Sequence, residues 1–581
     1  MKKGKWMYSM GMLVVVIASL IFGSIGASKS AEASGESVKK VVGYYTSWGA
    51  KDRDYQVEDI DGTNLTHINY AFADICWNGV HGNPSVGNPG SKTWKCQDKS
   101  IPLQSKKIPN GTVVLGDPEI DVQRAYGKKT VKDCNRAECG NFAKLADLKE
   151  KHPHIKTLIA VGGWSWSNRF SDAAADPATR KVFAKSSVEF IRAYGFDGVD
   201  LDWEYPVEGG LKGNSLRPED KENYTSLLQE IRNELDKAEK EDGKQYLLTI
   251  AAGISGSFIK NTELSKIAGI VDWINLMTYD FHGGWETTTN HNAPLYFSKN
   301  DPNNSWGLTV KESVERYKAA KVPMDKVTLG LPFYGKGWTG VDGGGQNGEY
   351  QTATPGSNGS FLPQGTWDDA ASGITGIFDY GDLAANYINK KGYKRYWNDE
   401  AKVPFLYNQR TKSFISYDDR ESIGHKTDFI ESQDMEGAMI WDLSLDCRTS
   451  GKYTCKGDTL LQKISDDLLE GGIKGPDQGG INHVNVTYTI TSKWGSGSIF
   501  QIRIKNSGTS PIDDWKVEFD YAGEIQQIWN GRIISESQHH YVIKNDQWNK
   551  KINPGETVTI GGEGRGPAPA VITNVSVNEM D

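Results

Sequence analysis

Four acidic residues stand close together in the segment Asp197-Gly198-Val199-Asp200-Leu201-Asp202-Trp203-Glu204. Because side chains two apart share a face of an extended strand, Asp200, Asp202 and Glu204 are expected to point to the same side. Carboxyl groups crowded on a buried face raise one another's pKa, and one that stays protonated near neutral pH can act as a general acid. The spacing therefore predicts a catalytic acid, Glu204, supported by two further carboxyls. Asp197 has no place in this alternation, and no role is assigned to it.

Two other interpretations of this segment are a solvated acidic edge and a calcium site. The acids alternate with Val, Leu and Trp, which is unlike a solvated edge, and calcium sites usually take ligands from loops with a sharp glycine turn. Metal-dependent hydrolysis has no motif either, because the 10 histidines contain no H-E-x-x-H pattern. His152 and His154 flank Pro153, which is typical of a surface turn. We therefore expect acid catalysis without a metal or another cofactor.

The acidic segment is one of eight short β-rich runs that alternate with longer amphipathic stretches. The runs cover residues 41–45, 67–73, 157–161, 198–203, 246–251, 273–279, 327–333 and 438–443. The stretch 177–194 is a predicted helix, with Asp176 as its cap and Pro177 in its first turn, and 217–241 is another. Eight strands with intervening helices predict an α/β fold, a (β/α)8 TIM barrel whose active site lies at the carboxyl ends of the strands.

Two connections in this region are too long to be simple helices. Residues 74–140 carry four of the six cysteines, many Gly and Pro and little periodicity, so they predict a loop-rich excursion pinned by disulfides. Residues 335–437, between the seventh and eighth strands, predict a small α+β insertion that would deepen a cleft at the barrel mouth. The triplet Gly343-Gly344-Gly345 in this insertion is not a phosphate loop, because no G-K-[ST] follows it.

The composition changes after residue 470. Residues 471–481 form a Gly/Pro-rich linker, and residues 482–581 alternate apolar and polar residues in short β-branched runs, which predicts a second domain, a β-sandwich. Trp515 lies within one of these runs. Trp494, Trp529 and Trp548 instead lie in polar, turn-rich segments, where exposed rings could bind the flat face of a polysaccharide. Core packing is the alternative for these three.

Charge and the N-terminal residues indicate the cellular context. The formal net charge is -8 and no basic stripe is present, which excludes the electrostatic footprint of a nucleic-acid binder. Residues 1–33 combine lysines, an apolar run and the A-x-A pattern Ala31-Glu32-Ala33, and so predict a cleaved secretory signal peptide. A membrane anchor is the alternative, but Ser19 and Gly23 interrupt a run that is already short for a span. We expect a secreted, extracellular protein without a membrane contact after cleavage.

The six cysteines come in close pairs. Because disulfides persist in exported proteins, we pair Cys76 with Cys96, Cys134 with Cys139, and Cys447 with Cys455. A metal site is the alternative, but the sequence has no C-x-x-C motif and no nearby histidine pair at ligand spacing.

The octet D-G-V-D-L-D-W-E, followed by Tyr205-Pro206, resembles the signature of family 18 glycoside hydrolases, the retaining chitinases with a (β/α)8 barrel. Further matching segments are Gly43-Tyr44-Tyr45 with Trp48, Val161-Gly162-Gly163-Trp164, Met277-Thr278-Tyr279-Asp280, and Trp441. The resemblance covers residues 38–470 and includes the long insertion, which is similar to that of bacterial chitinases with deep clefts. One departure is Ala160, where the family usually has serine, and this change bears on the packing around the acids.

The resemblance implies a substrate-assisted reaction in which the protein supplies no nucleophile. Glu204 would protonate the glycosidic oxygen while the 2-acetamido oxygen of the sugar attacks its own anomeric carbon. Asp202 would stabilise the acetamido group as an oxazolinium ion forms, Asp200 would tune Asp202, and Tyr279 would donate to the acetamido oxygen. The substrates implied are chitin and N-acetylglucosamine oligomers, since only a sugar with an N-acetyl group carries the nucleophile.

The resemblance also implies substrate-binding residues. Trp441 would form the floor of the reacting subsite, and Trp48, Trp164 and Trp285 would be further platforms, each with core packing as the alternative. Tyr44, Met277 and Asp280 complete this predicted set. The C-terminal region resembles family 2 carbohydrate-binding modules, although it lacks the cysteine pair that many members carry, and would bind insoluble polysaccharide through Trp494, Trp529 and Trp548. We expect a monomer.

Two other functions fit the same barrel. A non-hydrolytic chitin lectin generally lacks the acid at the position of Glu204, which is present here. An endo-β-N-acetylglucosaminidase that acts on glycoproteins would share both the barrel and the acids. The predicted row of tryptophans and the polysaccharide-type C-terminal region favour chitin.

Overall fold

The computed structural model describes residues 39–86, 93–97, 108–125, 139–369, 373–448, 451–455, 459–469, 484–494, 497–506, 510–521, 523–537, 539–554, 556–566 and 573–579. The predicted signal peptide and linker therefore lie outside the described residues. Among the described residues, no helix is long and apolar enough to cross a membrane.

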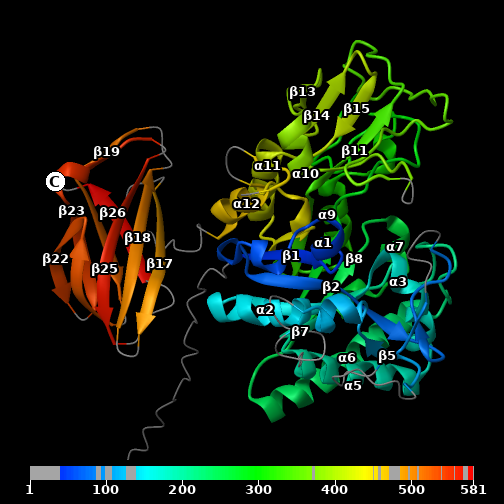
Figure 1. The fold of residues 1–581 in the computed structure, drawn as a ribbon, viewed down its shortest axis with the longest axis horizontal. Coiled ribbons are helices and arrows are strands. Elements are labelled where there is room, and N and C mark those ends of the chain that lie inside the picture. The colour runs from blue at the N-terminus through cyan, green and yellow to red at the C-terminus, as the bar shows by residue number, and fades with distance from the viewer. Residues whose placement is uncertain are drawn as a thin grey trace, which may run out of the picture. The chain divides into compact units, whose positions relative to one another are not determined.

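Eight parallel strands form a closed barrel (Figure 1). They are β1 (Lys40–Thr46), β2 (His67–Cys76), β6 (Lys156–Gly162), β7 (Gly198–Asp202), β8 (Leu247–Ala252), β9 (Trp273–Leu276), β10 (Val327–Pro332) and β16 (Gly437–Trp441). The barrel closes because β1 pairs with β16 on one side and with β2 on the other. Each strand overlaps one of the eight predicted runs, so the predicted TIM barrel is confirmed.

Amphipathic helices alternate with these strands, as the sequence indicates. The helices are α1 (Gly49–Asp52), α2 (Gly140–Lys151), α3 (Gly163–Trp166), α4 (Phe170–Ala175), α5 (Pro177–Tyr194), α6 (Asp220–Asp242), α7 (Gly256–Lys260), α8 (Leu264–Ile267), α9 (Val310–Ala319), α11 (Arg420–Ser432) and α12 (Leu460–Leu468). The Asp176 side chain accepts from the backbone N–H of Ala178 at the start of α5, and Gly195 ends this helix in the left-handed conformation. The local signals in the sequence thus define α5 at both ends.

The excursion after β2 is held together by a disulfide. Cys76 and Cys96 are bonded, as predicted, and the short strands β3 (Val80–His81), β4 (Trp94–Lys95) and β5 (Thr112–Val114) lie in this region. The pairing of Cys447 with Cys455 is also confirmed. Cys139 is disulfide-bonded, and its predicted partner Cys134 lies outside the described residues.

The predicted insertion between the seventh and eighth barrel strands is present as a five-stranded antiparallel sheet. Its strands are β11 (Tyr334–Thr339), β12 (Ile377–Asp379), β13 (Lys394–Asn398), β14 (Val403–Asn408) and β15 (Ser413–Ser416), with α10 (Tyr380–Asp382) between β12 and β13. Strand β11 begins two residues after β10 ends. The insertion is therefore anchored directly at the carboxyl end of a barrel strand, where the active site of this fold lies.

The C-terminal region consists of antiparallel strands, as predicted. One four-stranded sheet contains β17 (Val484–Trp494), β18 (Gly497–Asn506), β25 (Thr557–Arg565) and β21 (Glu524–Trp529). The other contains β22 (Gly531–Ser537), β23 (His540–Asn545), β20 (Trp515–Asp520) and β26 (Thr573–Glu579). A pair formed by β19 (Ile512–Asp513) and β24 (Lys551–Ile552) completes the region. Its apolar core includes Trp515, Phe500 and Tyr541.

Candidate active site

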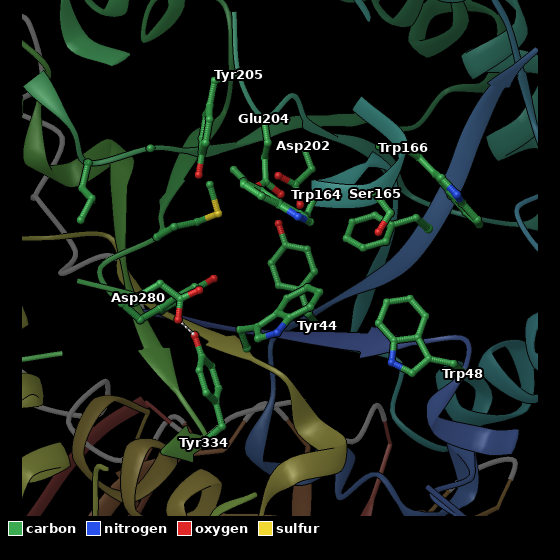
Figure 2. A pocket seen from close by; sticks show the side chains of 18 of the residues that line it. Tyr44, Trp48, Trp164, Ser165, Trp166, Asp202, Glu204, Tyr205, Asp280 and Tyr334 are labelled. Carbon is green, nitrogen blue, oxygen red and sulfur yellow. Dashed lines mark hydrogen bonds between the residues drawn. The ribbon is translucent and has the colours of Figure 1, made fainter. Parts of the chain in front are cut away.

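A cleft of about 560 Å³ opens at the carboxyl ends of the barrel strands. Its lining combines three carboxyl groups with many aromatic rings, as expected of a site that binds flat, amphipathic ligands. Figure 2 shows the side chains of Glu204 and Asp202 next to each other in the cleft. The lining residues are Tyr44, Trp48, Phe72, Trp94, Gly162, Trp164, Ser165, Trp166, Asp202, Glu204, Tyr205, Ala251, Gly253, Ile254, Met277, Tyr279, Asp280, Tyr334 and Trp441.

Asp200 lies below the cleft inside the barrel and is completely buried. Its Oδ2 accepts a hydrogen bond from the Tyr44 hydroxyl at 2.5 Å. Its Oδ1 accepts from the Thr249 hydroxyl at 2.5 Å and from the Asn275 amide at 3.2 Å. Burial raises the pKa of Asp200, while these donors oppose the rise by stabilising the charged form. Donors from three different strands thus hold one carboxyl group in place.

Asp202 and Glu204 form a hydrogen-bonded carboxyl pair directly above Asp200. Burial and the negative charges of Glu204 and Asp200 raise the pKa of Asp202 well above its usual range. Burial also raises the pKa of Glu204 to about 7, and the charge of Asp280 contributes. The pair titrates as a unit and can retain a proton near neutral pH, as a general acid requires.

The backbone around the pair is fixed by two polar side chains. The Ser167 hydroxyl accepts from the backbone N–H of Glu204 at 2.8 Å and lies 3.0 Å from the carbonyl of Asp202. The Asn214 amide donates to the carbonyl of Glu204 at 3.0 Å. Since Glu204 lies two residues beyond the end of β7, these contacts replace the strand pairing that ends there and keep the acid in a defined position.

The structure accounts for two positions that the sequence left open. Asp197 precedes β7 at the opposite end of the strand, where it accepts from the Lys149 ammonium at 2.5 Å and the backbone N–H of Thr157 at 2.9 Å. It therefore stabilises the fold away from the cleft. Ala160 lies in register with Asp200 on β6. A hydroxyl at that position is not needed to hold Asp200, because Tyr44 and Thr249 already supply two.

Tyr279 and Asp280 line the cleft on the side away from β6. The Tyr279 hydroxyl is buried and contacts the Met439 sulfur at 3.7 Å. Asp280 Oδ1 accepts from the Tyr334 hydroxyl at 2.5 Å, drawn as a dashed line in Figure 2, and is 2.7 Å from the Lys336 ammonium. Both partners come from β11, so the insertion supplies part of the cleft wall. Sequence reasoning missed Tyr334 and Lys336, since nothing local in the sequence relates them to Asp280.

The aromatic residues predicted from the resemblance mostly line the cleft. Trp441 stacks on Phe72, with ring centroids 6.0 Å apart, and Trp48 contacts the same phenylalanine at 6.2 Å. Trp164 lines the cleft and is 50% exposed. Tyr44 and Met277 also line it. Trp285 is the exception, because it lies outside the lining residues and is 61% exposed.

Besides Tyr334, sequence reasoning did not assign four further lining aromatics to the cleft, namely Phe72, Trp94, Trp166 and Tyr205. Trp166 stands two residues after Trp164 in the pattern W-S-W, which is a local signal that could have identified it. Trp94 contacts Trp166 edge-on with centroids 6.2 Å apart. No sequence signal indicates Trp94, because it reaches the cleft only through the tertiary fold of the segment that the Cys76–Cys96 disulfide holds.

Two of the C-terminal tryptophans lie against the same face of one sheet. A Cβ on Gly497 would be 2.7 Å from the Trp494 ring, and a Cβ on Gly561 would be 1.8 Å from the Trp529 ring nitrogen. Gly497 pairs with Arg565, four residues from Gly561 on β25, so both glycines face the same side. Trp494 is 44% and Trp529 38% exposed. Both rings therefore lie flat on an outer sheet face.

Trp548 is the third of these tryptophans and is 73% exposed. Its neighbour Asn549 donates to the carbonyl of Asn530 at 2.8 Å, which places Trp548 next to the end of β21. Trp515 is instead fully buried and donates its ring N–H to the carbonyl of Asn549. The structure thus separates one core tryptophan from three exposed ones, as the sequence context indicates.

In the part of the chain that the structure describes, no group of three or more His, Cys, Asp or Glu side chains is arranged to hold a metal ion. The cleft itself contains three carboxyl groups, those of Asp202, Glu204 and Asp280, and no histidine among its lining residues.

Comparisons with known proteins agree with this geometry. Residues 40–446 match the family model "Glycosyl hydrolases family 18", and residues 484–580 match "Cellulose binding domain". Chitinase A1 of Niallia circulans is 51% identical over 482 residues, which are 82% of this chain and 64% of that protein. Chitinase ChiA of Flavobacterium johnsoniae is 33% identical over 463 residues, 71% of this chain and 27% of that protein. The chain thus spans less than two thirds of the length of these two relatives.

A solved structure, chitinase ChiA74 from Bacillus thuringiensis, is 48% identical with a TM-score of 0.73. The match covers 93% of this chain and 100% of that one.

Proposed function

Because the chain belongs to family 18 of the glycosyl hydrolases, we propose that it is a chitinase that cuts β-1,4 linkages between N-acetylglucosamine units. The observation that carries this proposal is the buried pair of Asp202 and Glu204 in an aromatic cleft. Their shared burial raises the pKa of Glu204 to about 7. A proton held there at neutral pH is available to a glycosidic oxygen bound in the cleft.

In the first step Glu204 donates its proton to the glycosidic oxygen, and the bond from that oxygen to the anomeric carbon breaks. The acetamido oxygen of the same sugar forms a new bond to the anomeric carbon, which gives an oxazolinium ion. Asp202 accepts a hydrogen bond from the acetamido N–H and its negative charge stabilises this cation. Tyr279 donates to the acetamido oxygen and keeps it directed at the anomeric carbon.

In the second step a water molecule attacks the anomeric carbon and the bond to the acetamido oxygen breaks. Glu204, now a carboxylate, takes a proton from that water and returns to its starting state. Two displacements at one carbon leave its configuration unchanged. The reaction is therefore retaining without a nucleophile from the protein, and Asp200 supports it by holding its charge beneath Asp202.

This reaction selects its substrate chemically. A sugar without the N-acetyl group lacks the attacking oxygen, so cellulose would not be cut even where its rings bind to Trp441 and Trp164. The indole face of Trp441 would carry the reacting sugar, with Trp48 and Trp164 as platforms along the cleft.

The C-terminal sheets would bind insoluble polysaccharide. Trp494 and Trp529 lie flat on one sheet face, and Trp548 is exposed next to the end of β21. Three exposed rings on one module would match the repeating flat rings of such a polymer. We assign residues 38–470 to catalysis, 471–481 to a linker and 482–581 to binding. Residues 1–33 would direct export, so that a monomeric enzyme meets chitin outside the cell.

The test is hydrolysis of soluble chitin oligomers by the full chain and its Glu204→Gln variant. Loss of the general acid is expected to lower kcat by about 10²- to 10⁴-fold while chitin binding is retained. Glu208→Gln is the matched control, because Glu208 is an exposed carboxylate nearby that lies outside the cleft. NMR should show the β configuration at the anomeric carbon of the newly formed reducing end.

An α product, appreciable turnover by Glu204→Gln, or cleavage of cellulose would contradict the proposal. A glycoprotein substrate tested beside chitin separates the two polymer classes, and preferential cleavage of the glycoprotein would also count against it.

A further inference from the structure

Beyond Asp280, the cleft wall continues into a series of contacts that the proposed reaction does not use. Lys336 starts it: this side chain is almost fully buried and its ammonium group is 2.7 Å from Asp280 Oδ1. The same ammonium lies over the Trp285 ring, 4.2 Å from its centroid. Such a cation–π contact holds an aromatic ring in a fixed orientation. Asp280 at the cleft and Trp285 outside it are thus connected through one lysine.

Trp285 is in turn connected to a second exposed tryptophan. Its ring N–H donates to Glu286 Oε1 at 3.0 Å, and the carboxylate of Glu286 also lies 3.1 Å from Nδ1 of His282. His282 is completely buried. Its imidazole stacks against the Trp306 ring, with centroids 6.4 Å apart and planes inclined by 20°. One carboxylate therefore positions both rings, directly for Trp285 and through His282 for Trp306.

The segment of Trp306 is also tied back to the cleft. The Arg316 guanidinium donates to the carbonyls of Trp306 at 3.2 Å and Gly307 at 2.8 Å. It also reaches the carbonyl of Ile254 at 3.5 Å. Ile254 is one of the residues that line the cleft, as is Asp280. Since one guanidinium contacts both segments, Trp306 stands at the rim of the cleft and not on a distant surface.

We propose that Trp306 is a further sugar-binding platform, which extends the cleft past Trp285 and carries a N-acetylglucosamine ring of a long chain. Trp306 is 54% exposed while one ring face packs on His282. A ring fixed on one face and open on the other can stack on the apolar face of a sugar with little loss of side-chain entropy. The continuous contacts from Asp280 to Trp306 favour a chain leaving the cleft as the ligand.

This inference rests on the proposed function and adds a dependence on chain length. An oligomer that ends within the cleft does not reach Trp306, whereas a longer one covers it. The platform would therefore increase the affinity for long oligomers and polymer more than for short ones.

The test measures binding of N-acetylglucosamine tetramer and octamer by calorimetry, with the full chain in a Glu204→Gln background to prevent turnover. Trp306→Ala is expected to weaken octamer binding by about tenfold, as loss of one aromatic stack implies, and tetramer binding by much less. Trp306→Tyr keeps an aromatic face and should restore most of the octamer affinity. Phe297→Ala is the control, because Phe297 is 56% exposed and takes no part in the contacts described.

Equal loss for tetramer and octamer, or unchanged octamer affinity in Trp306→Ala, would overturn the inference. Hydrolysis of chitin by the chain with native Glu204 is measured in parallel. If that hydrolysis is absent the proposed function fails, whereas hydrolysis without the length dependence contradicts only the role of Trp306.

Discussion

Replacing Asp202 by asparagine tests whether a second carboxylate acts in the proposed reaction. Asp202 is only 3% exposed, and burial and the charges of Glu204 and Asp200 raise its pKa. Asparagine has nearly the same size and keeps an oxygen acceptor, but it carries no negative charge. The substitution therefore removes the charge that would face the oxazolinium ion and leaves the shape of the cleft intact.

The size of the effect follows from the burial of this group. A charge about 4 Å from a cation contributes about 4 kcal/mol at an effective dielectric constant of about 20. A hydrogen bond to a charged group contributes about 1.5–3 kcal/mol. Because these contributions overlap, we expect a net loss of about 3–5 kcal/mol in transition-state stabilisation. This corresponds to a fall in kcat of about 10²- to 10⁴-fold.

Although Asp202→Asn should lower kcat, it should not lower the thermal stability of the fold. A carboxyl group whose pKa is raised by folding contributes stability that is fully present below its unfolded pKa of about 3.9 and is lost as the pH rises toward the folded value. Asp202 therefore costs stability at neutral pH, and asparagine removes that cost. We expect the Tm of Asp202→Asn at pH 7 to equal or exceed that of the parent chain.

The assay is the rate on a soluble chromogenic oligomer, with thermal unfolding of the same preparations. Asp121→Asn is the matched control: Asp121 is also buried, has a pKa raised to about 8 by burial, and lies outside the cleft. The control should keep the rate. A near-native kcat in Asp202→Asn would refute the role of Asp202, and a rate loss accompanied by a large drop in Tm would refute the reasoning from its charge.

Two further predictions follow from the site and the C-terminal sheets. Glu204 has to be protonated, and its pKa is raised to about 7, so kcat/KM should fall as the pH rises through about 7. Asp280→Asn removes a charge that raises the pKa of Glu204, and should therefore move this fall in kcat/KM to lower pH. An unchanged pH profile would contradict the effect of Asp280 on Glu204. Deleting residues 481–581 should impair hydrolysis of insoluble chitin far more than hydrolysis of soluble oligomers. Trp548→Ala, which removes a 73% exposed ring, should reproduce part of that loss. Equal loss on both substrates would contradict the role of this region as a binding module.

Many features of the fold could be predicted because they depend on neighbours in the chain. Alternation in residues 198–204 placed three carboxyls on one side of a strand, and Asp176 with Pro177 marked the start of α5. The eight β-rich runs predicted a barrel, because eight parallel strands, each followed by a helix, are the number that closes into this fold. The close spacing of Cys76 with Cys96 and of Cys447 with Cys455 was enough to pair them.

The sequence by itself therefore determined the barrel, its insertion and the acidic strand, since each depends on periodicity over a few residues. Only the tertiary structure decided which side chains meet Asp200 and Asp280. Thr249 and Asn275 reach Asp200 from neighbouring strands through the register of the closed barrel. Tyr334 and Lys336 reach Asp280 because β11 begins directly at the carboxyl end of β10. Such contacts join residues that are far apart in the chain, and no local pattern records them.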